Sequence, residues 1–70
     1  MNLDYAKAKI KENVRLRHKF IYKGLRNQQE EFFGIISKMY PAIFTIILDN
    51  GELRSFSYSD FLIGNIEIID

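Results

Sequence analysis

Residues 42–57 read AIFTIILDNGELRSFS, and this stretch decides the fold class. Residues 42–48 are almost continuously apolar and rich in β-branched side chains, which is typical of a central strand of a sheet. Asn50-Gly51 follows, a pair that favours the positive-φ positions of a type I′ turn. We therefore predict a tight hairpin that joins a strand at 42–48 to a strand at 52–57.

The residues before this hairpin extend it into a sheet. Residues 32–40 form another apolar run, and Gly34 within it predicts a bulge or a sharp bend of the kind that closes a barrel. From residue 13 to residue 22 the side chains alternate with a period of two, which predicts the first strand. Residues 23–30 are polar and contain a glycine, so we expect a long exposed loop between these two strands.

Helices are expected at two places. Apolar residues recur at helical spacing in residues 3–12, which predicts one amphipathic helix, and barrel strands are expected over about 14–69. Ser and Asp within residues 57–62 predict a single capped turn of 3₁₀ or α-helix, and residues 65–69 predict the last strand. The predicted fold class is mainly β: an N-terminal α-helix, then a five-stranded SH3-like or Sm-like small barrel with a short helical turn before the last strand.

The composition limits what such a fold can do. The chain has 70 residues, 47% of them hydrophobic and 27% charged, and we expect residues 1–70 to form a single domain with one core. It has no cysteine, so disulfides, thiolate nucleophiles and sulfur-ligated zinc are excluded, and a cytoplasmic location is favoured. No apolar run reaches the length of a membrane span, so neither export nor membrane insertion is expected.

The side chains that could carry catalysis are few. His18 is the single histidine, and it occupies one of the alternating strand positions that face the core. We therefore predict a packed histidine and not a catalytic base. The adjacent Glu30 and Glu31 would project to opposite faces of a strand, which is typical of a solvated surface and not of an acid–base pair. No nucleotide-binding or metal-binding motif is found, so we expect no enzyme activity, cofactor, metal or small-molecule substrate.

Charge is distributed unevenly along the chain. Residues 1–26 hold eight basic and two acidic residues, a net +6, whereas residues 27–70 hold two basic and seven acidic residues, a net −5. Period-two spacing places Arg15, Arg17 and Lys19 on one strand face, where they could follow a phosphate backbone or meet an acidic protein surface. The alternative is a solvated face whose charges discourage edge pairing. The candidate contacts to a protein partner or nucleic acid are Arg15, Arg17, Lys19, Lys23, Arg26 and Phe32.

Aromatic side chains could add stacking platforms for bases on this barrel. Tyr22, Phe32 and Phe33 are the candidates, and adjacent Phe32 and Phe33 would point to opposite faces, which leaves one of them available to a partner or to self-association.

Several motifs resemble a known family. They are GII at 34–36, YPAIF at 40–44, FSYSDFL at 56–62 and IEI at 66–68, with Leu48-Asp49 and Arg54 between them. Their order and spacing resemble the Veg family of small bacterial proteins over roughly the second half of the chain. In the loop, where Veg-like proteins tend to carry a glycine pair and several bases, only Gly24 and Arg26 correspond.

The resemblance implies a function as well as a fold. Veg-like proteins are small SH3-like barrels that stimulate biofilm formation in Gram-positive bacteria, by antagonising a DNA-binding repressor of matrix genes. It therefore implies a non-catalytic, cytoplasmic regulator that works through protein contacts. Two other hypotheses stay open: a barrel that binds RNA or DNA with the same cations, and a homo-oligomer built through its strand edges or its helix.

Overall fold

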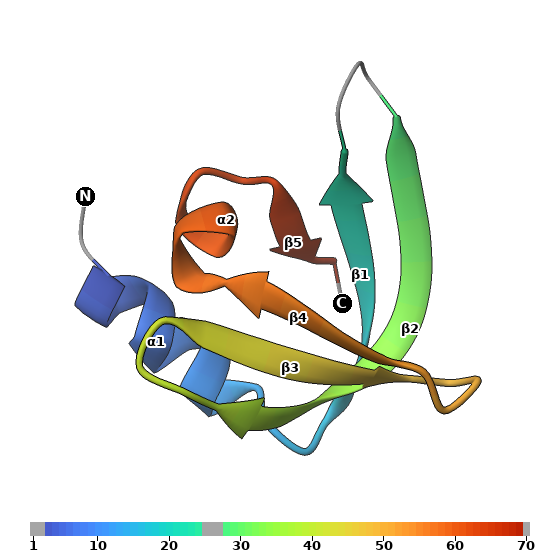
Figure 1. The fold of residues 1–70 in the computed structure, drawn as a ribbon, viewed down its shortest axis with the longest axis horizontal. Helices are drawn as coiled ribbons and strands as arrows, with labels where there is room; N and C mark the ends of the chain where they lie inside the picture. The colour runs from blue at the N-terminus through green and yellow to red at the C-terminus, as the bar shows by residue number, and fades with distance from the viewer. Residues whose placement is uncertain (1–2, 25–27, 70) are drawn as a thin grey trace.

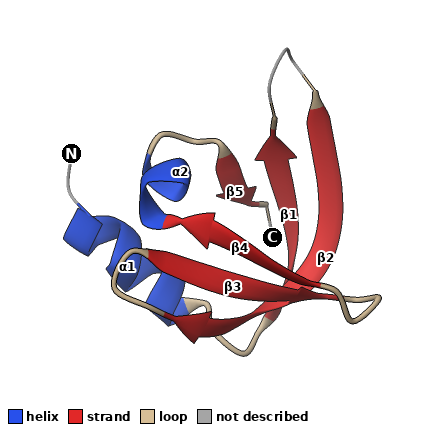
Figure 2. Ribbon diagram, viewed as in Figure 1, coloured by secondary structure: helices blue, strands red, loops and turns tan. Residues whose placement is uncertain are grey.

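The computed structural model describes residues 3–24 and 28–69. The elements are α1 (Leu3–Glu12), β1 (Arg17–Lys23), β2 (Gln29–Met39), β3 (Ile43–Leu48), β4 (Leu53–Ser57), α2 (Tyr58–Leu62) and β5 (Ile66–Ile68). Their order is the predicted one, and α1 has the predicted bounds (Figure 1). Both helices lie together on one side of the molecule (Figure 2). No helix in these two described ranges has the length and apolar character that a membrane crossing requires.

The five strands form one antiparallel sheet in the order β4-β3-β2-β1-β5. β2 is shared between two halves of this sheet, because its residues 29–35 pair with β1 and its residues 34–39 pair with β3. Figure 1 shows β2 curving from the β1–β2 hairpin to run beside β3. The mainly β fold is confirmed, but the sheet is open: β4 and β5 are its edge strands and do not pair with each other.

Gly34 lies where β2 passes from one partner strand to the other. A Cβ atom at this position would come within 2.7 Å of both Ile46 Cγ2 and the Ile47 carbonyl oxygen, so only glycine lets β2 and β3 approach this closely. The shift in ladder register follows between Ile36 and Lys38, beyond Gly34. There the buried Thr45 hydroxyl accepts a hydrogen bond of 3.1 Å from the Lys38 N–H, which satisfies a donor in the irregular part of the ladder.

The core fills the concave face of the curved sheet and is closed by α1. Its buried apolar residues are Ala6, Ile10, Phe20, Ile36, Phe44, Ile46, Leu48, Phe56, Tyr58 and Ile66. Ala6 and Ile10 are one helical turn apart, so α1 presents a single apolar face to the sheet. The buried Tyr58 hydroxyl donates to the Tyr40 carbonyl at 2.8 Å, which ties the start of α2 to the end of β2.

The hairpin between β3 and β4 is at the predicted place, but the predicted type I′ turn is wrong. The Gly51 N–H donates to the Leu48 carbonyl at 2.8 Å, and Leu48 in turn donates to Glu52, which leaves a loop of three residues and not two. Gly51 has φ +89°, whereas Asn50 is not among the described residues with positive φ. Asn50 instead accepts the Glu52 N–H through its side chain at 2.8 Å, the pattern of a turn followed by one left-handed glycine.

The first strand begins later than predicted. Residues 13–16 form the connection from α1, and Arg15 has φ +67°, which is not a strand conformation. The connection runs beside β2 at Ile36, which pairs with Val14 in an isolated parallel bridge and accepts the Arg15 N–H at 3.2 Å. Arg15 is therefore not part of the predicted row of three strand cations.

The loop between β1 and β2 is shorter than predicted. β1 continues through Lys23 and β2 begins at Gln29, and the Gly24 N–H donates to the Gln28 carbonyl at 2.8 Å. The predicted helical turn is confirmed as α2, where the Ser57 hydroxyl accepts the Asp60 N–H at 3.0 Å as an N-cap.

Candidate functional site

The cations of β1 are two of the three predicted strand cations, Arg17 and Lys19, and Lys23, which was predicted to lie in the loop; each of them lies on the outer face of the sheet and meets a carboxylate. Arg17, Lys19 and Lys23 alternate with core-facing residues of β1 such as Phe20. The ion pairs are Arg17–Asp49, Lys19–Glu31 and Lys23–Glu67, with N···O distances of 2.5, 3.0 and 2.6 Å. Each pair joins the basic first part of the chain to its acidic second part, so the charge asymmetry of the sequence is largely cancelled along β1.

The Arg17–Asp49 pair has the most defined geometry. Arg17 Nε and Nη2 donate to the two carboxylate oxygens of Asp49 at 3.1 and 2.5 Å, which is a bidentate arrangement. The hydrogen bond from Arg17 lowers the pKa of Asp49 and raises the pKa of Arg17, against a smaller opposing effect of desolvation. Both side chains are half exposed, at 56% and 51%, so this pair orients the two groups more than it stabilises the fold.

The aromatic side chain that shares a face with these cations is Phe33. The Arg17 guanidinium carbon lies 4.5 Å from the centre of the Phe33 ring, which is 40% exposed. Phe32, the predicted contact, faces the core instead, where its ring is half-buried and stacks on Phe20 at 5.5 Å. The expectation that one of the two rings is exposed is confirmed, but Phe32 lies on the wrong face to act together with Arg17.

Beside Phe33, an apolar row crosses three strands on the same face. Ile35 pairs with Ile47, and Ile47 pairs with Leu53, so the three side chains are direct cross-strand neighbours. Their exposed fractions are 39%, 43% and 60%. Arg17 pairs with Ile35 and begins the row on β1. We call the residues Arg17, Lys19, Phe33, Ile35, Ile47 and Leu53 the outer-face surface.

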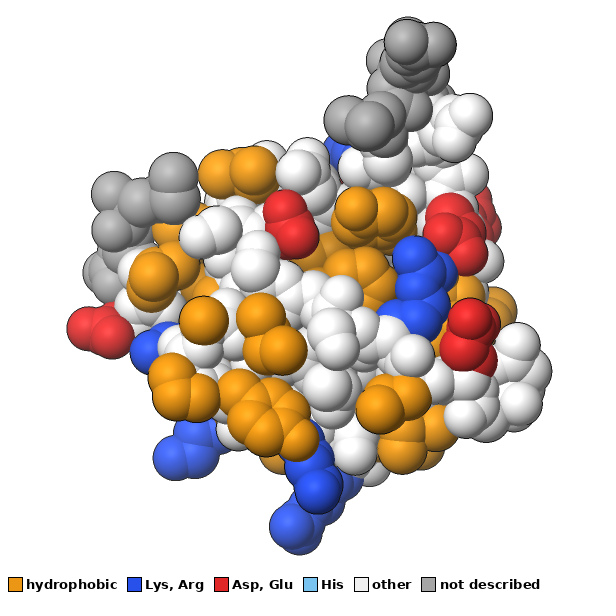
Figure 3. Space-filling model, in the orientation of Figure 1, with side chains coloured by type: hydrophobic (Ala, Val, Ile, Leu, Met, Phe, Trp, Pro, Cys, Tyr) orange, Lys and Arg blue, Asp and Glu red, His pale blue; other side chains and the backbone are white. Residues whose placement is uncertain are grey.

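The remaining predicted contacts lie elsewhere. Arg15 is exposed in the connection after α1, and Arg26 lies outside the described residues. Within the described ranges, the basic side chains without an ion pair are Lys7, Lys9, Lys11, Arg15 and Lys38. Several Lys and Arg side chains project from the part of the molecule around α1 (Figure 3). The cations that remain unpaired are thus mainly those of α1, not those of β1.

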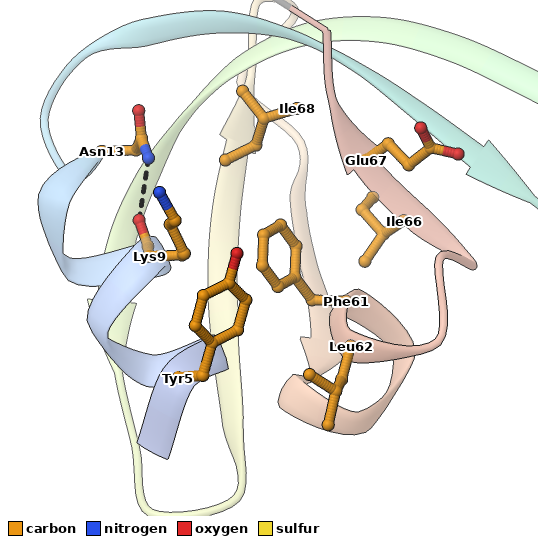
Figure 4. A pocket seen from close by; sticks show the side chains of 8 residues that line it. All are labelled: Tyr5, Lys9, Asn13, Phe61, Leu62, Ile66, Glu67 and Ile68. Carbon is orange, nitrogen blue, oxygen red and sulfur yellow. Dashed lines mark hydrogen bonds between the residues drawn. The ribbon is translucent and has the colours of Figure 1, made fainter. Parts of the chain in front are cut away.

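A groove of about 470 Å³ lies between α1 and the far edge of the sheet (Figure 4). It is lined by Tyr5, Lys9 and Asn13 of α1 and its end, by Phe61 and Leu62 of α2, and by Ile66, Glu67 and Ile68 of β5. The Asn13 amide donates to the Lys9 carbonyl at 2.8 Å, which fixes it against the helix. Among the described residues that line the groove, Lys9 is the one cation and none belongs to the outer-face surface.

Metal-ligating side chains are not clustered in the parts of the chain that the structure describes. No three His, Asp or Glu side chains come close enough there to hold a metal ion. His18 is half-buried and meets Phe20 edge-on at 6.2 Å, which confirms the predicted packed histidine.

The comparison with family models agrees with the motifs of the second half and extends the similarity to the first half. The model described as Biofilm formation stimulator VEG matches residues 1–69 of the chain. The chain belongs to the VEG family. The resemblance seen in the sequence is therefore confirmed. No curated protein matches this VEG protein.

The sequence did not reveal the apolar row of this VEG protein. The run from Ile43 to Leu48 is almost continuously apolar, which hides the fact that Ile47 points outward while Ile46 is fully buried. The available signal was the alternation of side chains between the two faces of a strand. Leu53 and Phe56 are three residues apart, so once Phe56 is placed in the core, Leu53 must point to the other face. Its neighbours Ile35 and Ile47 become a row only when the register of three strands is known.

Proposed function

We propose that this VEG protein is a non-catalytic, cytoplasmic regulatory module that acts in biofilm formation by binding a protein at its outer-face surface. The observation that carries this proposal is the row Ile35, Ile47 and Leu53, which exposes aliphatic side chains in register across three strands. A row of this kind on a sheet face gains free energy when a partner covers it. The family description supports the connection with biofilms.

The charges around the row favour a protein partner over a polyanion. Lys19 and Arg17 already have carboxylate partners, so a phosphate backbone would have to displace Glu31 and Asp49 to reach them. A protein surface can instead cover the apolar row while these ion pairs stay at the rim, as is usual for protein interfaces. The resemblance to Veg supports a DNA-binding repressor of matrix genes as the partner.

The test is biofilm formation by bacteria in which the chain is replaced by variants. Ile47→Thr with Leu53→Thr removes aliphatic surface and leaves a β-branched side chain, which suits a strand, at both positions, so we expect less than about 1 kcal/mol of lost stability. Biofilm stimulation should fall to the level of a strain without the protein. Ile63→Thr is the matched control, because Ile63 is 58% exposed and lies outside the outer-face surface. Full stimulation by the folded double variant would refute the proposal.

Self-association is a distinct outcome of the same surface. Sedimentation of the purified chain and of the double variant separates the two, because a second copy as the partner would give a dimer that the variant loses.

A second candidate function is nucleic-acid binding through α1 and the connection that follows it, favoured by the cations there that have no ion pair with a described residue. Lys11 and Arg15 are exposed and have no ion pair with a described residue. If they contact duplex DNA, Lys11→Gln with Arg15→Gln should reduce the slope of log K against log salt by about 1.8. Lys19→Gln with Glu31→Gln removes an ion pair without changing net charge and should leave the affinity unchanged. If this second variant alone lost binding, the contact with DNA would instead lie on the outer face of β1.

A further inference from the structure

Arg54 occupies an unusual place for an arginine: the concave face of the sheet. It points to the same face of β4 as the buried Phe56, and its cross-strand partner is the fully buried Ile46. Its guanidinium carbon lies 5.3 Å from the ring centres of Phe32 and Phe56 and 5.7 Å from that of Tyr22. These rings come from three strands, so the curvature of the sheet brings them around one cation.

The aromatic rings hold this guanidinium in place and leave part of it open to solvent. The Arg54 side chain is 26% exposed, the lowest value among the basic members of the four ion pairs. A cation over aromatic faces is attracted to their negative π surfaces, and the attraction grows as water is excluded. Figure 3 shows a basic side chain on this side of the molecule that lies between apolar and acidic side chains.

One carboxylate of the chain itself occupies the open side of Arg54. Nη1 donates to Glu30 Oε2 at 2.8 Å, and no other described side chain accepts from this guanidinium. Glu30 faces Tyr22 across the β1–β2 ladder and is 54% exposed, so it reaches Arg54 from the rim of the concave face. A guanidinium can give a carboxylate two parallel hydrogen bonds, and Glu30 takes one.

We propose that Arg54 is a carboxylate-binding site for an acidic segment of a protein partner, and that Glu30 occupies this site until a carboxylate of the partner replaces it. The inference rests on the proposed function in so far as it takes the partner to be a protein, and it adds a second contact on the opposite face of the sheet. An acidic side chain that approaches from solvent can form the bidentate pair that Glu30 does not form. The rings would then position the guanidinium without further loss of side-chain freedom.

This arrangement predicts that removing the carboxylate of Glu30, but not that of its neighbour Glu31, strengthens the binding of an acidic ligand. Because an exposed ion pair is weak, Glu30→Gln should raise the affinity for such a ligand by about two- to fivefold. Glu31→Gln is the matched control: it is the next residue, it removes the same charge, and it pairs with Lys19 on the outer face. Arg54→Lys keeps the charge but loses the planar fork, so affinity should fall about fivefold or more.

The experiment is an NMR titration of the full chain at low salt with a capped decapeptide of alternating glutamate and serine. The largest chemical-shift changes should be those of the Arg54 Nε–H and of the rings of Phe32 and Phe56. The affinity for the peptide should be highest for Glu30→Gln, intermediate for wild type and lowest for Arg54→Lys. A peptide with glutamine in place of glutamate should not bind. Equal gains from Glu30→Gln and Glu31→Gln, or tighter binding of a single-stranded DNA of equal charge, would overturn the proposal.

The two proposals fail separately. Ile47→Thr with Leu53→Thr leaves Arg54 untouched, so the decapeptide should bind this variant as it binds wild type, even though biofilm stimulation is lost. If the decapeptide does not bind wild type while the double variant still loses stimulation, the outer-face proposal stands and the Arg54 site is refuted.

Discussion

Replacing Gly34 by alanine should cost this fold about 1.5 kcal/mol. The new Cβ would lie 2.7 Å from Ile46 Cγ2 and 2.7 Å from the Ile47 carbonyl oxygen, well inside the separation of about 3.5 Å at which such atoms normally touch. Neither atom can move easily, since Ile46 is fully buried and the oxygen belongs to the backbone of a central strand. Overpacking of this kind costs about 1–3 kcal/mol, and the stiffer unfolded chain of alanine returns about 0.5 kcal/mol.

Urea and thermal unfolding followed by circular dichroism measure this cost. With about 4–8 °C per kcal/mol for a chain of this size, the midpoint temperature should fall by about 6–12 °C. Gly24→Ala is the control, because its nearest neighbours would be 3.7 Å or more from the added Cβ, and its stability should change little. A Gly34→Ala protein within about 0.5 kcal/mol of wild type would refute the argument that close approach of β2 and β3 requires glycine here.

Three further predictions test the turn, the outer ion pair and the buried tyrosine. Gly51→Val should destabilise the hairpin by about 1–2 kcal/mol in urea unfolding, because φ is +89° there and a β-branched side chain is strained at positive φ, although nothing lies within 4 Å of the added Cβ. Arg17→Gln should return the pKa of Asp49 to its ordinary range in a carboxyl NMR titration; since pairing lowers this pKa in the folded state, the contribution of the pair is present above about pH 4 and lost as pH falls. Tyr58→Phe should cost about 1 kcal/mol through loss of the bond to Tyr40, and because burial raises the pKa of Tyr58, wild type but not the variant should lose this contribution to stability as pH rises above about 10.

The parts of the fold that the sequence predicted correctly are those set by local chemistry. α1 has its predicted bounds because helical spacing of Ala6 and Ile10 is visible in the sequence. The cap of α2 was predicted because the Ser57 hydroxyl bonds a backbone N–H only three residues away. Contacts between residues this close along the chain can be predicted from a single sequence.

The errors came from contacts between distant residues. Arg15 takes positive φ where the connection after α1 pairs with β2 at Ile36, a contact over twenty-one positions that the alternation of polar and apolar residues does not reveal. The turn at Asn50-Gly51 has three residues because Leu48 pairs with Glu52, and this pairing follows from the register of the whole hairpin. The open edge between β4 and β5 likewise depends on how far the sheet curves, which is a property of packing.

The cation row on β1 shows how strand order decides which charges remain available to a partner. β1 lies between β2 and β5, and each neighbour places a carboxylate on the outer face, Glu31 and Glu67, beside Lys19 and Lys23. Because α1 lies outside the sheet, its lysines form no ion pair with any residue in 3–24 or 28–69. The basic residues of the first part of the chain therefore fall into two groups: those on β1 are paired with carboxylates, and those on α1 have no ion pair with a described residue. A net +6 over the first part of the chain thus does not measure the charge that a ligand meets on the sheet, and the apolar row beside the paired cations is left as the feature that a partner can recognise there.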